Sequence, residues 1–124
     1  MEQYREYSVL GHLDMIKRYD RCGDYPDEKI LPVVEKILKR AIADEKGIEV
    51  NTSSFKYGLK DYMPSERILA LYHELGGRII TLGSDSHETE HLADRIPFMQ
   101  EVLKKLGYRE FCTFEQMRPV FHTL

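Results

Sequence analysis

Apolar residues recur at helical spacing in three stretches of this chain. The clearest stripe lies in residues 27–45, where successive apolar positions are alternately three residues and one residue apart: Ile30, Val33, Val34, Ile37, Leu38, Ala41 and Ile42. This spacing places the side chains on one face of a helix. Gly47 then follows as the expected left-handed residue after the helix end.

Two further helices are predicted. The first follows Ser65, a favourable N-cap, and its apolar stripe is Ile68, Leu69, Tyr72 and Leu75. Gly76 ends this helix. The second begins near Pro97, which suits a first helical turn, and its stripe is Phe98, Val102, Leu103 and Leu106. Gly107 closes it.

Short apolar runs between the helices predict strands. They lie at residues 6–12, 48–52, 79–82 and 110–114, with a last short strand at 120–122. The order of elements is therefore β, α, β, α, β, α, β. Such alternation predicts an α/β fold of parallel strands joined by right-handed crossovers, in an open sheet or a barrel.

Polar residues of chemical interest follow the carboxyl ends of three successive strands. They are His12, Asn51 and the pair Asp85 and His87. Parallel strands bring these ends to one face, where α/β proteins keep their functional groups. Carboxylate and imidazole suit a divalent metal such as zinc, manganese or iron. The alternative is a strand that ends in a polar turn, with Asp85 and Ser86 as caps.

Composition narrows the possible functions. The length of 124 residues is that of one compact domain. A net charge of -3 and a pI of about 6.0 do not provide the basic face that nucleic-acid binding requires. The pattern shows neither a membrane span nor a signal peptide. Because Cys22 and Cys112 form no metal or disulfide framework, we expect a reduced, cytoplasmic setting.

Four motifs, in order, resemble the PHP (polymerase and histidinol phosphatase) family. They are Gly-His-Leu-Asp at 11–14, Glu-Val-Asn-Thr-Ser at 49–53, Pro-Ser at 64–65 and Gly-Ser-Asp-Ser-His at 83–87. The histidinol-phosphatase branch is the most similar. The resemblance implies a distorted (β/α)7 barrel with metal ions at the carboxyl ends of its strands. This chain would form a partial PHP domain, the second half of that barrel.

The resemblance also implies roles for individual residues. His12, Asp85 and His87 match metal ligands of the family. His87 would also face the nucleophile, which makes Asp85 and His87 the catalytic candidates. Lys56 stands where the family commonly has an arginine that binds substrate phosphate. A lysine keeps the charge and loses the bidentate geometry of arginine.

Further candidates each have an ordinary structural alternative. Asp14 could orient His12, or it could cap a turn. Asn51 could contact substrate, or it could brace its loop through hydrogen bonds to the backbone. Arg18 could bind phosphate, or it could pair with a surface acid. His91 is predicted to be exposed.

The family's His-x-His strand and its bridging glutamate do not occur in this sequence. We therefore expect a fragment of a longer enzyme or a truncated reading frame. The expected function is hydrolysis of L-histidinol phosphate to L-histidinol and phosphate, a step of histidine biosynthesis, impaired in this chain. Two alternatives stay open: another PHP-type phosphoesterase with a different phosphorylated substrate, and a non-catalytic half-barrel that associates with itself.

We predict that the purified chain forms at least a homodimer. An open parallel sheet leaves strand edges and an apolar interior face uncovered, and a second copy can cover them. Sedimentation equilibrium over a range of concentrations measures the association. A chain that stays strictly monomeric at high concentration would contradict this prediction.

Overall fold

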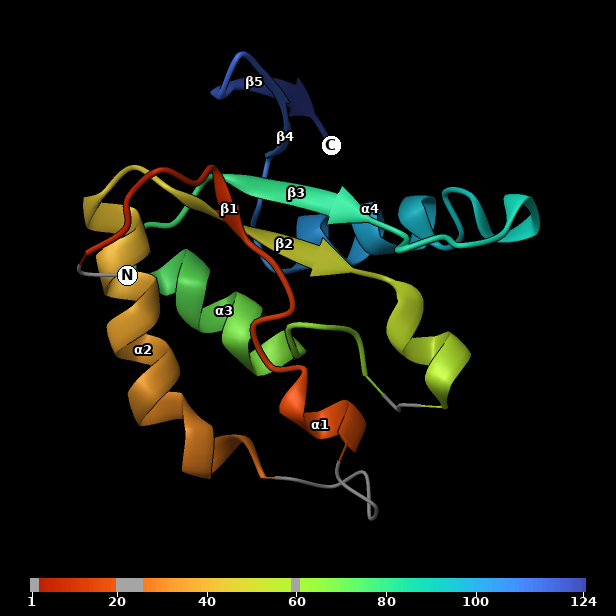
Figure 1. Ribbon diagram of the computed structural model, residues 1–124, viewed down its shortest axis with the longest axis horizontal. Coiled ribbons are helices and arrows are strands. Elements are labelled where there is room, and N and C mark those ends of the chain that lie inside the picture. The colour runs from red at the N-terminus through yellow and green to blue at the C-terminus, as the bar shows by residue number, and fades with distance from the viewer. Residues whose placement is uncertain (1–2, 20–25, 59–60) are drawn as a thin grey trace.

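The computed structural model of this protein describes residues 3–19, 26–58 and 61–124, without the side chains of Phe55 and Tyr57. Cys22 lies outside the described residues. The elements, shown in Figure 1, are β1 (Val9–Leu10), α1 (Ile16–Tyr19), α2 (Asp27–Ala43), β2 (Gly47–Asn51), the short 3-10 helix η1 (Ser53–Tyr57), α3 (Glu66–Glu74), β3 (Ile80–Gly83), a second 3-10 turn η2 (Thr89–His91), α4 (Ile96–Lys105), β4 (Glu110–Glu115) and β5 (Arg118–Thr123).

The first three strands form a parallel sheet in the order β1-β2-β3. β2 lies in the middle, and it pairs with β3 in register from Ile48 opposite Ile80 to Asn51 opposite Gly83. The arrows of β2 and β3 run side by side in the same direction in Figure 1. The predicted parallel α/β arrangement is therefore confirmed for these strands, and their carboxyl ends share one edge.

The prediction of a fourth parallel strand is wrong. β4 pairs antiparallel with β5 in a separate two-stranded sheet. The two residues between the strands, Gln116 and Met117, have positive φ angles of 48° and 63°. Two successive residues of this conformation form the tight turn that suits a hairpin. The chain therefore returns directly beside β4, and β4 is used in a hairpin instead of extending the parallel sheet.

The hydrophobic core lies between the parallel sheet and the helices. α2 and α3 lie on one side of the sheet in Figure 1. The buried cluster contains Val34, Leu38, Ile48, Val50, Ile68, Leu69, Tyr72, Ile80, Met99 and Leu103. Val33 and Phe98 belong to the predicted apolar stripes but are exposed, because the buried faces of α2 and α4 are narrower than the stripes. No helix in the described part of the chain is long and apolar enough to cross a membrane.

Two of the three predicted helices end at the glycine that the sequence predicts. Gly76 and Gly107, with φ angles of 88° and 97°, follow α3 and α4. After α2 the left-handed residue is Glu45, with a φ of 55°, whereas Gly47 is the first residue of β2. A Cβ atom at Gly47 would lie 2.4 Å from the carbonyl oxygen of Ile79. Close strand packing therefore requires this glycine.

Leu38→Ala is expected to lower the free energy of unfolding by about 2–5 kcal/mol, because truncation of a buried leucine leaves a cavity. The Leu38 side chain is fully buried in α2. Val33→Ala on the same helix is the control, since Val33 is 60% exposed, and it should change stability by less than about 1 kcal/mol. Urea denaturation followed by circular dichroism measures both. Similar losses in the two variants would contradict the observed packing.

Candidate metal site at the carboxyl ends of the sheet

Hydrogen bonds fold the loop after β3 against the end of β2. Thr52 donates its backbone N–H to the carbonyl of Gly83 at 2.9 Å. The Thr52 hydroxyl donates to the carbonyl of Asp94 at 2.7 Å. Within the loop, the Ala93 N–H donates to Ser84 Oγ at 3.2 Å. The segment that carries the predicted ligands is therefore held beside the neighbouring strand.

Asp85 and His87 lie together in this loop. His87 Nε2 is 3.7 Å from Asp85 Oδ1. The side chain of Asp85 is 26% exposed, whereas that of His87 is 74% exposed. The carboxylate is therefore partly enclosed, and the imidazole is accessible to a ligand.

Two of the three predicted metal ligands have left-handed backbone conformations. The φ angle is 53° at His12 and 48° at Asp85. Histidine and aspartate enter this region more readily than most residues, yet it is uncommon for any residue except glycine. Such conformations cost on the order of 1–3 kcal/mol and concentrate at functional sites. Glu45, Gln116 and Met117 have the same conformation in ordinary turns, so these φ angles place His12 and Asp85 in tight turns and leave their metal-binding role a prediction.

The described residues bring few metal donors together at this edge of the sheet. Within residues 3–19, 26–58 and 61–124, no group of three or more His, Cys, Asp or Glu side chains could hold a metal ion. Asp85 and His87 provide oxygen and nitrogen donors of the kinds that zinc uses. His12 is exposed in the loop after β1. The donor types thus fit a divalent metal. A structural zinc site commonly takes four ligands, which is more than the described residues bring together.

Lys56 lies beside the ligand-bearing loop. Its Nζ is 3.9 Å from Glu88 Oε2, and His91 Nε2 is 3.4 Å from the same oxygen. The side chain of His91 is 36% exposed, less than the sequence predicts. Because Glu88 is 64% exposed, its pair with Lys56 is weak in water. The predicted phosphate-binding lysine and the predicted ligand loop therefore adjoin.

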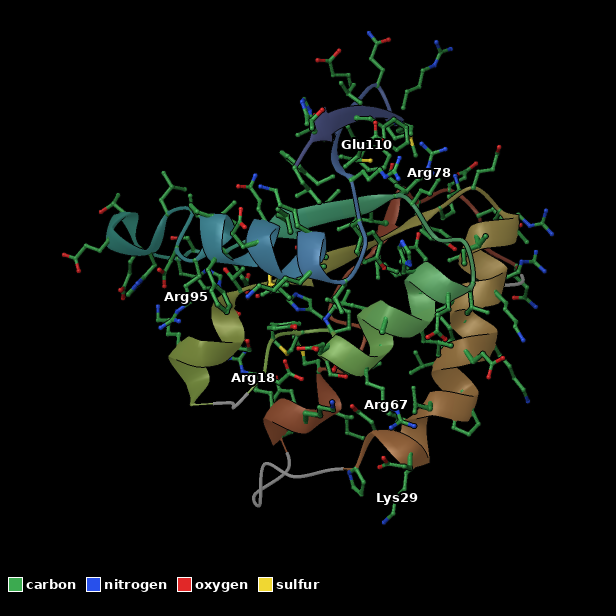
Figure 2. All side chains as sticks on the ribbon, turned by 180° about the vertical axis from the view of Figure 1, so that it is seen from behind. Arg18, Lys29, Arg67, Arg78, Arg95 and Glu110 are labelled. Atoms are coloured by element: carbon green, nitrogen blue, oxygen red, sulfur yellow. The ribbon has the colours of Figure 1, made fainter. Side chains whose placement is uncertain are left out.

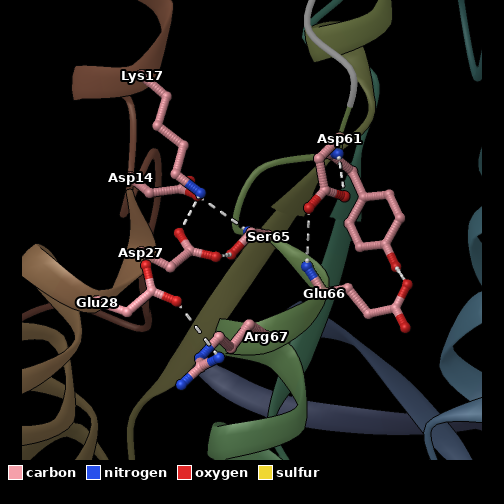
Figure 3. Close-up of polar contacts among 9 residues, drawn as sticks. Asp14, Lys17, Asp27, Glu28, Asp61, Ser65, Glu66 and Arg67 are labelled. Carbon is pink, nitrogen blue, oxygen red and sulfur yellow. Dashed lines mark hydrogen bonds and ion pairs between the residues drawn. The ribbon is translucent and has the colours of Figure 1, made fainter. Parts of the chain in front are cut away.

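Asp14 is buried in a network that joins three helices (Figure 3). Its Oδ2 accepts a hydrogen bond from the Ser65 N–H at 2.9 Å and lies 3.4 Å from Lys17 Nζ. Asp27 pairs with the same lysine and accepts a hydrogen bond from the Ser65 hydroxyl at 2.9 Å. Burial raises the pKa of the Asp14 carboxyl. Asp14 thus caps the start of a distant helix and not a turn of its own segment, and support of His12 stays a prediction.

Ser65 occupies the predicted N-cap position of α3, but its hydroxyl does not cap the helix. The hydroxyl instead binds Asp27. The first N–H of α3, that of Glu66, donates to Asp61 Oδ2 at 3.3 Å (Figure 3). The start of α3 is therefore held by two aspartates from other segments of the chain, Asp14 and Asp61.

Asn51 braces its loop. Its side chain is fully buried, and its Oδ1 accepts a hydrogen bond from the Ser53 N–H at 2.9 Å. Within the described residues, its Nδ2 has no hydrogen-bond partner. Arg18 lies on α1, and Figure 2 shows it toward the same end of the molecule as Arg95 at the start of α4. Contact of Asn51 or Arg18 with substrate stays a prediction.

Glu49 is a candidate that the sequence analysis does not single out. Its neighbours Ile48 and Val50 are fully buried in the core, so the alternation of β2 directs Glu49 to the opposite face of the sheet. A Cβ atom built on Gly83 would lie 2.7 Å from Glu49 Oε1, and one on Gly11 would lie 3.1 Å from Oε2. The carboxylate therefore lies between the ends of β1 and β3. A charged residue between two apolar ones in a predicted strand is the sequence signal that could have identified it.

Sequence comparison gives relatives with one activity. No family model matches the chain. The chain is 36% identical over 83% of its length to a probable histidinol-phosphatase of Thermotoga maritima, and 32% identical over 95% of its length to the histidinol-phosphatase of Lactococcus lactis. These matches cover 42% and 44% of the two relatives. The chain therefore spans less than half the length of the curated relatives it matches.

Structure comparison agrees. The fold matches the crystal structure of a histidinol phosphate phosphatase from Lactococcus lactis, complexed with zinc, L-histidinol and phosphate, with a TM-score of 0.74 and 27% identity. The match covers 96% of this chain and 46% of that chain. This chain is thus an α/β protein with a three-stranded parallel sheet. Sequence and structure together relate it to part of the histidinol-phosphatases.

Asp14→Ala is expected to lower the free energy of unfolding by about 1–3 kcal/mol, because it leaves the buried Ser65 N–H without an acceptor. Asp14→Asn keeps an acceptor oxygen and should lose less. Urea denaturation of the two variants measures the difference. Equal losses would show that Asp14 does not stabilise the chain through its hydrogen bond to Ser65.

Proposed function

We propose that this chain is part of a PHP-type phosphatase that hydrolyses L-histidinol phosphate to L-histidinol and phosphate. The observation that supports this most is the match to a histidinol phosphate phosphatase solved with zinc, L-histidinol and phosphate, which covers 96% of this chain. The partial domain would correspond to the second half of a (β/α)7 barrel. Its site would lie at the carboxyl ends of the strands, as in other α/β barrels.

Asp85 and His87 would hold a divalent metal ion, with His12 as a further ligand from the neighbouring strand end. The zinc of the related structure suits these imidazole and carboxylate donors, as manganese or iron would. When bound, a metal ion lowers the pKa of a coordinated water to about 7 and so supplies hydroxide for attack on the phosphate.

Lys56 would bind a phosphate oxygen and neutralise charge that develops there. Its ammonium group lies 3.9 Å from Glu88 Oε2, in the loop that carries Asp85 and His87, and the phosphate would lie between them. Asn51 would act on Lys56 indirectly. Its bond to the Ser53 N–H fixes the first residue of η1, the segment that carries Lys56. Arg18, on α1, would be a second cation for phosphate.

A non-catalytic role is the second candidate. It is favoured by the small donor set, because the described residues bring together no group of three metal donors. It is also favoured by β1, which pairs with β2 on one side only among the described strands. Such an edge can pair with a second chain. In this case the chain would be a self-associating half-barrel.

Zinc titration of the purified chain tests the proposed ligands. We expect Asp85→Ala and His87→Ala each to weaken zinc binding at least about 10-fold, because each removes a direct donor. His73→Ala is the control, since His73 lies on α3 against the ring of Tyr108. Isothermal titration calorimetry measures the affinities. An unchanged affinity in Asp85→Ala would remove this residue from the proposed site.

Phosphate release from L-histidinol phosphate in the presence of zinc tests the activity itself. We expect weak or no turnover by this chain, because its described residues bring together no group of three metal donors. A rate normal for a phosphatase would contradict the expected impairment. Comparison with other phosphomonoesters would then separate histidinol-phosphatase from a different phosphoesterase.

A further inference from the structure

We propose that Glu49 binds the ammonium group of an amino-alkyl phosphate and thereby determines which phosphomonoesters this site accepts. The inference rests on the proposed phosphatase function and extends it to the cationic end of the substrate. It assigns a role to a carboxylate that lies outside the predicted ligand set.

Two glycines provide the space that Glu49 occupies. Its carboxylate oxygens lie 2.7 Å and 3.1 Å from the positions that a Cβ atom would take at Gly83 and Gly11. A side chain at either position would displace the carboxylate. Gly11 directly precedes His12, and Gly83 ends the strand that leads to Asp85. The carboxylate is therefore held beside the proposed metal and phosphate site.

The charge of Glu49 is not compensated within the described chain. Two other carboxylates that are withdrawn from water have cationic partners, since Asp14 lies beside Lys17 and Asp44 beside Arg40. Glu49 is half-buried, and within residues 3–19, 26–58 and 61–124 no hydrogen bond or ion pair engages its carboxylate. A partly desolvated carboxylate is costly unless a cation accompanies it. The site thus has a place for a positively charged ligand group.

The chemistry of L-histidinol phosphate supplies such a group. Its ammonium group is on the carbon next to the one that carries the phosphate ester, so cation and anion lie close together. With the phosphate near Lys56 and the Asp85–His87 pair, an ammonium group can approach the carboxylate between the two glycines. Lys56 and Glu49 would then bind opposite charges of one small substrate.

Matched ligands test the inference. The chain, with zinc present, is titrated with L-histidinol phosphate and with the analogue that has hydrogen in place of the amino group. We expect the wild-type chain to bind L-histidinol phosphate about 10-fold more tightly, as a hydrogen bond between charged groups provides. Glu49→Gln should abolish this difference and leave the affinities for the analogue and for zinc unchanged.

A second variant tests the same site without removing a charge. Gly83→Ala introduces the Cβ atom that would meet Glu49 Oε1, and it should also reduce the preference for the amine. Glu74→Gln, at an exposed position near the end of α3, is the control and should keep the full preference. Circular dichroism verifies that each variant is folded.

The outcomes separate this inference from the proposed function. Equal wild-type affinities for the two ligands, or an unchanged preference in Glu49→Gln, would overturn the role of Glu49 and leave the phosphatase proposal intact. A loss of zinc affinity in Glu49→Gln would assign the carboxylate to the metal and also overturn it. Failure of the wild-type chain to bind either ligand, with no phosphate release, would overturn the proposed function and the inference with it.

Discussion

Parallel pairing of β2 with both of its neighbours is the constraint on which the candidate site depends. Three residues far apart in the chain lie at the carboxyl ends of three different strands: His12, Asn51 and Asp85. Only a shared strand direction brings the three strand ends to one edge. A one-residue slip of β2 would turn Glu49 into the core and both Ile48 and Val50 out of it. The apolar residues of β2 therefore fix the direction of the polar ones.

The helices stabilise this register through buried polar contacts as well as apolar packing. Asp14 follows β1, yet its carboxylate accepts the Ser65 N–H at the start of α3. Lys17 lies between Asp14 and Asp27, so the segment after β1 is joined to α2 and α3. A buried network of this kind is favourable only when its groups are satisfied together. The position of the His12 loop thus depends on contacts made with α3.

The helices could be predicted because neighbouring residues in the sequence determine them. The stripes of α2, α3 and α4 and the glycines after α3 and α4 follow from periodicity and from the φ angles that glycine permits. The hairpin was not predicted, because Gln116 and Met117 lack the usual Asn-Gly or Asp-Gly signal of its turn. The capping of α3 was also not predicted in detail, since Asp14 lies 51 residues before Ser65.

The arrangement of Glu49 shows why the site could be predicted only in part. The motif residues are contiguous in sequence, so Asp85 and His87 could be recognised together, but Gly11, Glu49 and Gly83 meet only after three strands have paired. Read singly, each glycine resembles a turn residue and the glutamate resembles a solvated position in a strand. Once the strands pair, the two glycines leave space on both sides of the Glu49 carboxylate. Within the described residues, no cation pairs with it. The metal-binding residues define what chemistry is available, and this carboxylate would define which phosphate ester reaches it.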